Sequence, residues 1–220
     1  MKILIAGDST AANYKAPLYP MMGWGQALEY FAKQEVSVLN FAMPGRSTGT
    51  FRAEGHWQRL LDNISQGDWV FIQFGHNDQK IDQPVGVQED DFRNNLCRMY
   101  DEVRQRGGNV LLLTGVIRCA YCRKGLLIET QGNYPQIIRE TAEKLSLPLV
   151  DAQNILLDFE KRNGRMALQE LYCYPSPPNN WVPPGALDTS HFSISGAYKV
   201  AQMIVADIKR QQLPMADWFY

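Results

Sequence analysis

The chain has 220 residues, of which 45% are hydrophobic and 20% are charged, and its formal net charge is -1. This composition is typical of a globular protein with one sizeable core, and we expect a single domain over residues 1–220. The balanced charge, without a Lys/Arg cluster, argues against a nucleic-acid partner. No apolar run reaches the roughly 18 residues of a membrane span, so we expect no membrane partner either.

Five short apolar runs, rich in β-branched residues, predict strands at residues 3–6, 36–42, 69–74, 110–116 and, more weakly, 147–150. Continuous apolar runs of this kind fit strands that are buried on both faces of a parallel sheet. Apolar residues recur at helical spacing between the runs, within 24–31, 60–64, 92–103 and 137–145, and again in 194–208. Strands alternating with helices predict a three-layer α/β/α sandwich around a five-stranded parallel sheet.

The two ends of the chain raise separate expectations. The first run follows Met1 almost at once, which leaves no room for a signal peptide and predicts a cytoplasmic protein, or a secreted one if a leader has been removed. Near the other end, residues 175–185 contain five prolines and predict a long loop. Long loops in compact domains are usually functional, and this one leads into a candidate catalytic motif.

Two motifs far apart in the sequence point to nucleophilic catalysis. Ser9 lies in Gly-Asp-Ser-Thr directly after the first predicted strand, and Asp188 and His191 lie in Asp-Thr-Ser-His before the last predicted helix. A serine hydroxyl becomes an effective nucleophile when an imidazole takes its proton, and the imidazole needs a carboxylate to orient it. We therefore predict a serine esterase with Ser9 as nucleophile, His191 as general base and Asp188 as its orienting residue.

Other polar groups follow the predicted strands and would gather at the same edge of the sheet. In an open α/β sheet the ligand crevice lies beyond the carboxyl ends of the strands. The second strand leads to Gly45, and the third leads to His76 and Asn77. The backbone N–H groups of Ser9 and Gly45 and the side-chain amide of Asn77 could therefore donate to the oxyanion of a tetrahedral intermediate. His76 is expected to form hydrogen bonds at the edge of the site.

A second serine is an alternative candidate for the nucleophile. Gly45-Arg-Ser47-Thr-Gly49 matches the G-x-S-x-G nucleophile elbow, and Ser47 precedes Asp188 and His191 in the required order. That elbow needs a helix immediately behind the serine, whereas Thr48-Gly49-Thr50 is a poor helix start because its residues are weak helix formers. On this ground we expect no elbow at Ser47.

Cofactor chemistry is not expected. Cys119 and Cys122 form a C-x-x-C, which is typical of a redox pair or of half a zinc site. A structural zinc site needs four ligands, and neither a second C-x-x-C nor an H-x₃₋₅-H is present. We interpret the two residues as incidental loop thiols, with a metal or redox role as the alternative, and predict neither a metal nor another cofactor.

Taken together, these motifs resemble the SGNH (GDSL-type) hydrolase family. Its four blocks occur in order as Gly-Asp-Ser-Thr at 7–10, Gly45, Gly-His-Asn-Asp at 75–78 and Asp-x-x-His at 188–191. The match is most similar to the rhamnogalacturonan acetylesterase branch, through Tyr19-Pro20, Gly23-Trp24-Gly25, Asn40-Phe-Ala42, Glu54-Gly55, the run 71–78 and Thr189-Ser-His-Phe192. The segment 114–122 departs from the pattern of these relatives.

The resemblance implies a flavodoxin-like sandwich and removal of O-acetyl groups from pectin-derived saccharides through an acyl-enzyme. It implies Ser9 as nucleophile, with Gly45 and Asn77 in the oxyanion hole. The partner would be an acetylated oligosaccharide or polysaccharide, and Trp181 is a candidate for stacking on sugar rings, as are Trp24 and Trp57 unless they pack in the core. Arg46 either meets an acidic sugar or braces its loop. The alternatives are a general small-ester or lipid esterase and a non-catalytic carbohydrate-binding homologue.

Overall fold

A five-stranded, all-parallel sheet forms the centre of the protein in a computed structural model that describes residues 1–179 and 182–220. Its strands are β1 (Lys2–Gly7), β2 (Ser37–Asn40), β3 (Trp69–Gln73), β4 (Asn109–Leu113) and β5 (Leu149–Val150), in the order β2-β1-β3-β4-β5. The predicted fold class is confirmed. The second and fourth strands end before the apolar runs do, and the remaining apolar residues belong to the loops that build the site.

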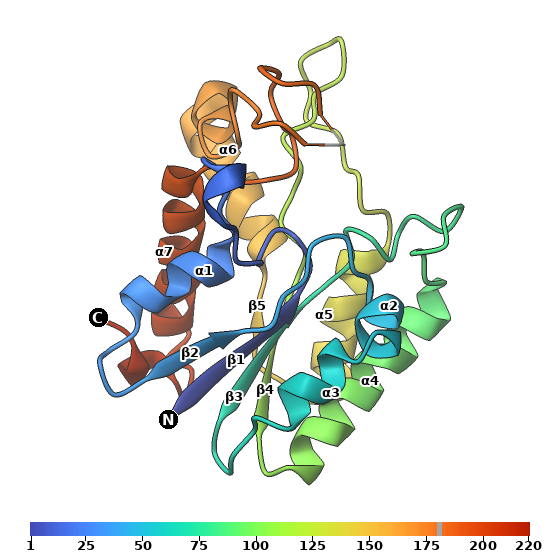
Figure 1. Cartoon of the computed structure of the whole chain (residues 1–220), viewed down its shortest axis with the longest axis vertical. Helices are drawn as coiled ribbons and strands as arrows, with labels where there is room; N and C mark the ends of the chain where they lie inside the picture. The colour runs from blue at the N-terminus through green and yellow to red at the C-terminus, as the bar shows by residue number, and fades with distance from the viewer. Residues whose placement is uncertain (180–181) are drawn as a thin grey trace.

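Helices cover both faces of this sheet (Figure 1). On one face lie α1 (Trp24–Leu28), α6 (Ala152–Gln169) and α7 (Ile194–Arg210). On the other lie α2 (Thr48–Ala53), α3 (His56–Leu61), α4 (Glu89–Gln105) and α5 (Tyr134–Lys144). Short 3₁₀ turns follow at Ala16–Leu18, Glu29–Phe31 and Ala216–Trp218. Among the described residues, no helix is both long and apolar enough to span a membrane.

The central strands show why the apolar runs are continuous. Successive side chains of a strand point to opposite faces, so Ile3 and Ile5 of β1 join one buried cluster and Leu4 and Ala6 join the other. All four side chains are fully buried. A strand that is covered on both faces has no solvent-exposed side, so its sequence does not alternate between apolar and polar residues. The sheet therefore lies between two hydrophobic clusters.

Helix α6 was not predicted from the sequence, for a physical reason. Half of its residues are exposed and only Ala152, Gln153, Leu156 and Leu168 are buried, so the apolar periodicity is weak. Its start is fixed by a cap instead, because the Asp151 carboxylate accepts the backbone N–H of Asn154.

The topology places a crevice at the carboxyl end of β1. The chain leaves β1 toward β2 on one side, whereas β3 lies on the other side, so the connections diverge there. In sheets of this strand order, ligands bind at this switch point. The loops that follow β4 and precede α7 rise above the same edge (Figure 1).

Candidate active site

Asp188 and His191 form an ion-paired unit in the loop before α7. His191 Nδ1 lies 2.8 Å from Asp188 Oδ2, while Asp188 Oδ1 accepts the backbone N–H groups of Ser190 and His191 at 2.8 and 3.1 Å. Burial works to raise the pKa of Asp188, but the hydrogen bond and charge of His191, together with the two backbone N–H groups, outweigh it and lower that pKa below its usual value. Asp188 is thus an ionised carboxylate that fixes the orientation of the imidazole, as a catalytic pair requires.

Ser9 lies half-buried on a braced turn after β1. The neighbouring carboxylate of Asp8 is fully buried, and its Oδ1 accepts the backbone N–H of Thr10 at 2.9 Å. The Thr10 hydroxyl lies 2.8 Å from that same oxygen and 3.0 Å from Oε1 of Gln73, at the end of β3. The Trp24 indole also donates to Gln73 Oε1, at 2.8 Å. These bonds hold the Ser9 turn against the neighbouring strand.

Tyr14 contacts both catalytic motifs and brings the two ends of the chain together. Its hydroxyl donates to the backbone carbonyl of Ser9 at 2.8 Å, and its ring meets the His191 ring edge-on with centroids 6.3 Å apart. Burial raises the pKa of Tyr14 well above its usual value, so the hydroxyl stays protonated and remains a donor. A backbone hydrogen bond of 3.0 Å from Met22 to Phe192 joins the same two segments.

Gly45, a predicted oxyanion donor, lies in a tight turn beside the end of β1. Met43-Pro44-Gly45-Arg46 is a turn closed by a 3.4 Å bond from Arg46 N to Met43 O, and Gly45 has a φ of +77°, which L side chains rarely adopt. The turn lies beside β1, because Met43 N donates to Gly7 O at 2.9 Å. Among the described residues, no group accepts a hydrogen bond from the N–H of Gly45 or of Ser9, so both are available to an oxyanion.

Asn77 completes the donor set. Its Nδ2 donates to the carbonyl of Arg46 at 3.0 Å, which places the amide beside the Gly45 turn, and its Oδ1 accepts from Lys80 Nζ at 2.8 Å. An amide carries two N–H groups. With the carbonyl taking one of them, the second is left for a developing negative charge.

We expect Asn77→Ala to lower kcat by ~10²–10³ while KM stays close to the wild-type value, because the oxyanion charge exists only in the transition state. Asn77→Asp is expected to be worse, since a carboxylate repels that charge. Steady-state kinetics on an aryl acetate would measure both, with Asn163→Ala on the exposed side of α6 as the control amide deletion. A raised KM with kcat preserved would instead assign Asn77 to ground-state binding.

Asp78 is a buried carboxylate that ties the Asn77 turn to α2. It accepts the N–H of Thr48 at 2.8 Å, the Thr48 hydroxyl at 2.6 Å and the N–H of Gly75 at 3.1 Å. Burial raises the pKa of Asp78 to about 6, although these hydrogen bonds act in the opposite direction. Asp78 therefore positions its neighbours from beneath the site.

The raised pKa of Asp78 makes its contribution to stability depend on pH. The folded pKa lies above the unfolded value near 3.8, so ionisation disfavours the folded state, and stability from this group falls as pH rises from about 4 to about 6. We expect the stability difference between Asp78→Asn and wild type to shift by roughly 3 kcal/mol in favour of the variant between pH 4 and 7. Urea denaturation at the two pH values would measure this shift. A constant difference would show that Asp78 has an ordinary pKa.

Ser47 is not placed as a nucleophile, but the ground on which its elbow was discounted is wrong. A helix does begin immediately behind it, because Ser47 is the N-cap of α2 and forms a capping box with Thr50. The buried Phe51 compensates for the weak helix formers at the start. Ser47 is fully buried and its hydroxyl accepts the Thr50 N–H, so a substrate carbonyl has no access to it.

The predicted substrate-binding residues His76 and Arg46 both form contacts that brace loops of the protein. His76 is 3% exposed and its Nε2 lies 2.5 Å from the Val116 carbonyl, so it supports the loop after β4 from below rather than facing a saccharide. Burial lowers the pKa of His76, which keeps the ring neutral. Arg46 braces its loop, through Glu54 at 2.8 Å and the Pro44 carbonyl at 2.9 Å. Trp181 lies outside the described residues.

Two tryptophans and His56 belong to the framework. Trp24 and Trp57 are buried, and their indole N–H groups donate to Gln73 and Glu102, so they pack rather than line a groove. His56 is tied to its own loop, because its Nε2 lies 3.1 Å from Glu54 Oε2.

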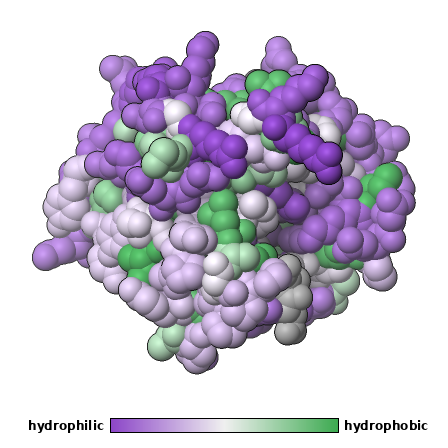
Figure 2. Space-filling model, turned by 90° about the horizontal axis from the view of Figure 1, so that it is seen from above, coloured by the Kyte–Doolittle hydropathy of each residue, from purple (hydrophilic) through white to green (hydrophobic). Residues whose placement is uncertain are grey.

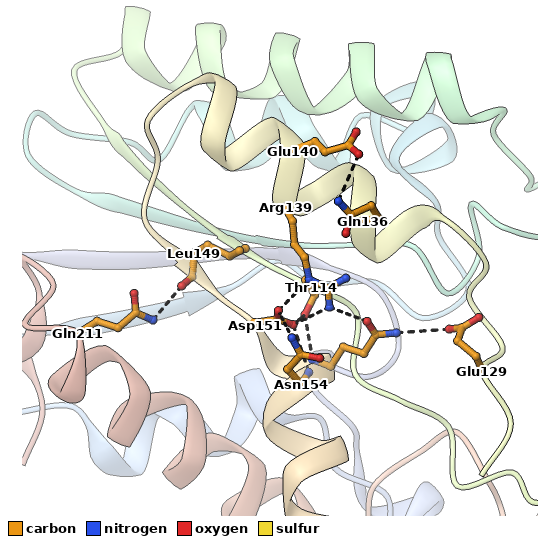
Figure 3. A network of polar contacts seen from close by, with 10 residues as sticks. Thr114, Glu129, Gln136, Arg139, Glu140, Leu149, Asp151, Asn154 and Gln211 are labelled. Carbon is orange, nitrogen blue, oxygen red and sulfur yellow. Dashed lines mark hydrogen bonds and ion pairs between the residues drawn. The ribbon is translucent and has the colours of Figure 1, made fainter. Parts of the chain in front are cut away.

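The loop between β4 and α5 reaches over the site and is anchored by polar side chains (Figure 3). Arg139 of α5 donates to both carboxylate oxygens of Asp151, at 2.8 and 3.0 Å, and the Thr114 hydroxyl donates to Asp151 Oδ1 at 3.0 Å. Gln153 continues the network to Glu129, which in turn accepts the backbone N–H of Gln131. One set of bonds thus fixes the end of β4, the start of α6 and the far end of the loop.

The structure adds residues to the site that the sequence did not suggest. Tyr14 lies between the catalytic motifs, Lys80 contacts Asn77, and Arg118 lies near Asp8 and Asp188. None of these three residues lies in a sequence motif or at a spacing that indicates a catalytic or binding role. Seen from above, the face that carries these loops is mostly hydrophilic and is hollowed between projecting side chains (Figure 2).

We expect dialysis against EDTA to leave the hydrolysis rate unchanged. Within the described residues, no group of three or more His, Cys, Asp or Glu side chains could hold a metal ion. Cys119 and Cys122 are free thiols, and burial raises the pKa of Cys119 to about 11, which disfavours the thiolate that a metal would bind. Activity lost on dialysis and restored by zinc would overturn this prediction.

Comparisons with known proteins bear on the family and the fold of the chain. The GDSL-like lipase/acylhydrolase family model matches residues 5–183. Rhamnogalacturonan acetylesterase RhgT of Bacillus subtilis is 33% identical, over 99% of this chain and 93% of its own. The crystal structure of YxiM from Bacillus subtilis superposes with a TM-score of 0.83 at 26% identity, over 97% of this chain but only 57% of that one. An acetylxylan esterase from Geobacillus stearothermophilus, at 19% identity, shares the fold with a TM-score of 0.65 over 94% and 93% of the two chains.

The fold and the matches define a carboxylic ester hydrolase built on an α/β/α sandwich. Within that class, the chain belongs to the GDSL-like lipase/acylhydrolase family.

Proposed function

We propose that the protein is a serine esterase that removes O-acetyl groups from pectin-derived, rhamnogalacturonan-type saccharides through an acyl-enzyme. The observation that carries the proposal is the Asp188–His191 pair, joined through Tyr14 to the Ser9 turn at the switch point of the sheet. The neighbouring turn offers a free backbone N–H at Gly45, and Asn77 offers an amide N–H.

In this mechanism Ser9 Oγ attacks the acetyl carbonyl carbon while His191 takes the hydroxyl proton. The carbonyl oxygen becomes an oxyanion, to which Ser9 N–H, Gly45 N–H and Asn77 Nδ2 donate. When the intermediate collapses, the C–O bond to the sugar breaks and His191 returns the proton to the sugar oxygen. A water molecule, deprotonated by His191, then attacks the acetyl-Ser9 ester; the bond between the acetyl carbon and Ser9 Oγ breaks, His191 returns the proton to Ser9 Oγ, and acetate is released. Asp188 stays ionised throughout and stabilises the imidazolium.

Two relatives support the substrate class. The RhgT relative is named a rhamnogalacturonan acetylesterase, and a second Bacillus subtilis protein, YesY, 31% identical over 98% of this chain, is named a probable one. The hydrophilic character of the face above the sheet suits a saccharide better than a lipid chain (Figure 2).

Acetate release provides the test. The purified protein is first assayed on an aryl acetate, and then on acetylated rhamnogalacturonan oligosaccharides beside acetylated xylo-oligosaccharides. We expect aryl acetate turnover, and faster acetate release from the pectic substrate than from the xylan substrate. Aryl acetate turnover without release from either saccharide would favour a general small-ester esterase. A protein inactive on all three would favour a non-catalytic homologue.

A further inference from the structure

Arg118 lies between the two halves of the candidate active site. The residue that follows it, Cys119, donates its backbone N–H to the Thr189 carbonyl at 2.8 Å, beside Asp188. On the other side, Arg118 Nη2 lies 3.4 Å from the carbonyl oxygen of His76, the residue before Asn77. The guanidinium is therefore close to the oxyanion donors and to the acid–base pair.

Arg118 has no directly bonded carboxylate within the described residues, since none forms an ion pair with it and its buried Nε has no hydrogen-bond acceptor. Asp8 and Asp188 act on it electrostatically. However, Asp188 is bonded to His191, and Oδ2 of Asp8 is itself buried without a partner, so Asp8 and Arg118 are not joined there. A partly buried cation without a carboxylate is unfavourable, and an anionic ligand would relieve that cost.

A second cation of the same kind lies nearby. Lys80 Nζ donates to Asn77 Oδ1 at 2.8 Å, a neutral acceptor, and no carboxylate within the described chain pairs with it. Burial lowers the pKa of Lys80 and the charge of Arg118 lowers it further, while the Asp8 carboxylate acts in the opposite direction. Lys80 contacts Asn77 and Arg118 contacts the carbonyl of the preceding residue, His76, so both cations lie against the same turn. Arg46, on the same rim, contrasts with both because Glu54 neutralises it.

We propose that Arg118 and Lys80 together bind the carboxylate of a uronic acid residue in the substrate. This inference rests on the proposed saccharide deacetylation and assigns its acidic specificity to two residues. The planar guanidinium can donate to both carboxylate oxygens, whereas the ammonium adds a compact charge beside Asn77. A free uronic acid supplies the missing counter-charge, and its methyl ester or a neutral pentose does not.

The experiment measures competitive inhibition of aryl acetate hydrolysis by a galacturonic acid disaccharide and by its methyl ester. With the wild-type protein we expect the free acid to inhibit ~10–100-fold more tightly than the ester, the range expected for hydrogen bonds to a charged group. In Arg118→Gln the two inhibitors are expected to become nearly equal. Arg118→Lys keeps the positive charge but loses the planar set of N–H donors, so it should retain part of the preference for the free acid.

Arg123→Gln is the matched control, because Arg123 lies exposed in the same loop and outside the site. It removes the same charge and should preserve the wild-type preference. Equal inhibition of the wild-type protein by acid and ester would overturn the proposal, and that comparison needs no variant. A preference that Arg118→Gln leaves intact, or that Arg123→Gln abolishes, would also overturn it.

The same assay separates this inference from the proposed function. If acetylated pectic substrates release no acetate but the free acid still inhibits more tightly, the deacetylation proposal fails and the carboxylate site stands. If acetate is released equally well from acidic and methyl-esterified substrates and inhibition shows no preference for the free acid, the deacetylation proposal stands and the carboxylate site is overturned.

Discussion

Replacement of Ser9 by alanine is expected to lower kcat on an aryl acetate by at least ~10⁴, because the nucleophile is lost while the oxyanion donors and the binding surface remain. The residual rate would come from those donors. Ser9 forms no side-chain hydrogen bond within the described residues, and the turn is held by Asp8 and Thr10, so the thermal unfolding of the variant should match wild type. Rapid-quench detection of an acyl-enzyme, present in wild type and absent in the variant, would complete the measurement.

Ser47→Ala is the control for that experiment. It removes the N-cap of α2 and should cost about 1 kcal/mol of stability, with a much milder effect on kcat. The opposite result, in which Ser47→Ala abolishes the acyl-enzyme and Ser9→Ala does not, would establish the nucleophile elbow at Ser47 and overturn the mechanism proposed above.

Asp188→Asn is expected to lower kcat by up to ~10⁴, the size of effect seen when the orienting carboxylate of a serine triad is replaced by its amide. An asparagine in this position presents an N–H or a neutral oxygen to His191 Nδ1, so it favours the wrong tautomer and no longer stabilises the imidazolium. KM should change little, because Asp188 is 1% exposed and does not reach a substrate. The split between kcat and KM is the measurement that identifies this role.

Asp158→Asn makes a suitable control, because Asp158 is an exposed carboxylate on α6 that forms a 3.4 Å ion pair with Arg162. It should leave kcat unchanged. If Asp188→Asn behaved in the same way, some group other than Asp188 would be orienting the imidazole.

The sequence was sufficient for the centre of the sheet because β1, β3 and β4 are buried on both faces. Val70 and Ile72 of β3 pack against one layer and Phe71 against the other, so the strand is apolar from Trp69 to Ile72 and stands out from its polar surroundings. The Asp188–His191 pairing was equally predictable, since it depends on a separation of three residues within one loop. Signals confined to a few neighbouring residues need no knowledge of the rest of the fold.

The remaining parts of the site depend on distant contacts and gave no such signal. Arg118 matters because its loop is joined to Thr189, and Tyr14 because its ring meets His191 from the far end of the chain. The start of α2 was misjudged for a related reason, because intrinsic helix propensity is overridden when Phe51 is buried and Ser47 and Thr50 cap the helix. Tertiary packing decides all three cases.

The anchoring of the loop between β4 and α5 has a consequence for how this enzyme could be re-engineered. Thr114, His76 and the Asp151 network fix the two ends of that loop, while residues 123–126 at its tip are exposed and lie outside both hydrophobic clusters. Tip sequences of another length or charge can therefore be grafted between the fixed ends without disturbing the sheet. The tip is thus separable from the scaffold and from the site, and it is the position at which a peptide or a small binding module could be inserted into this esterase.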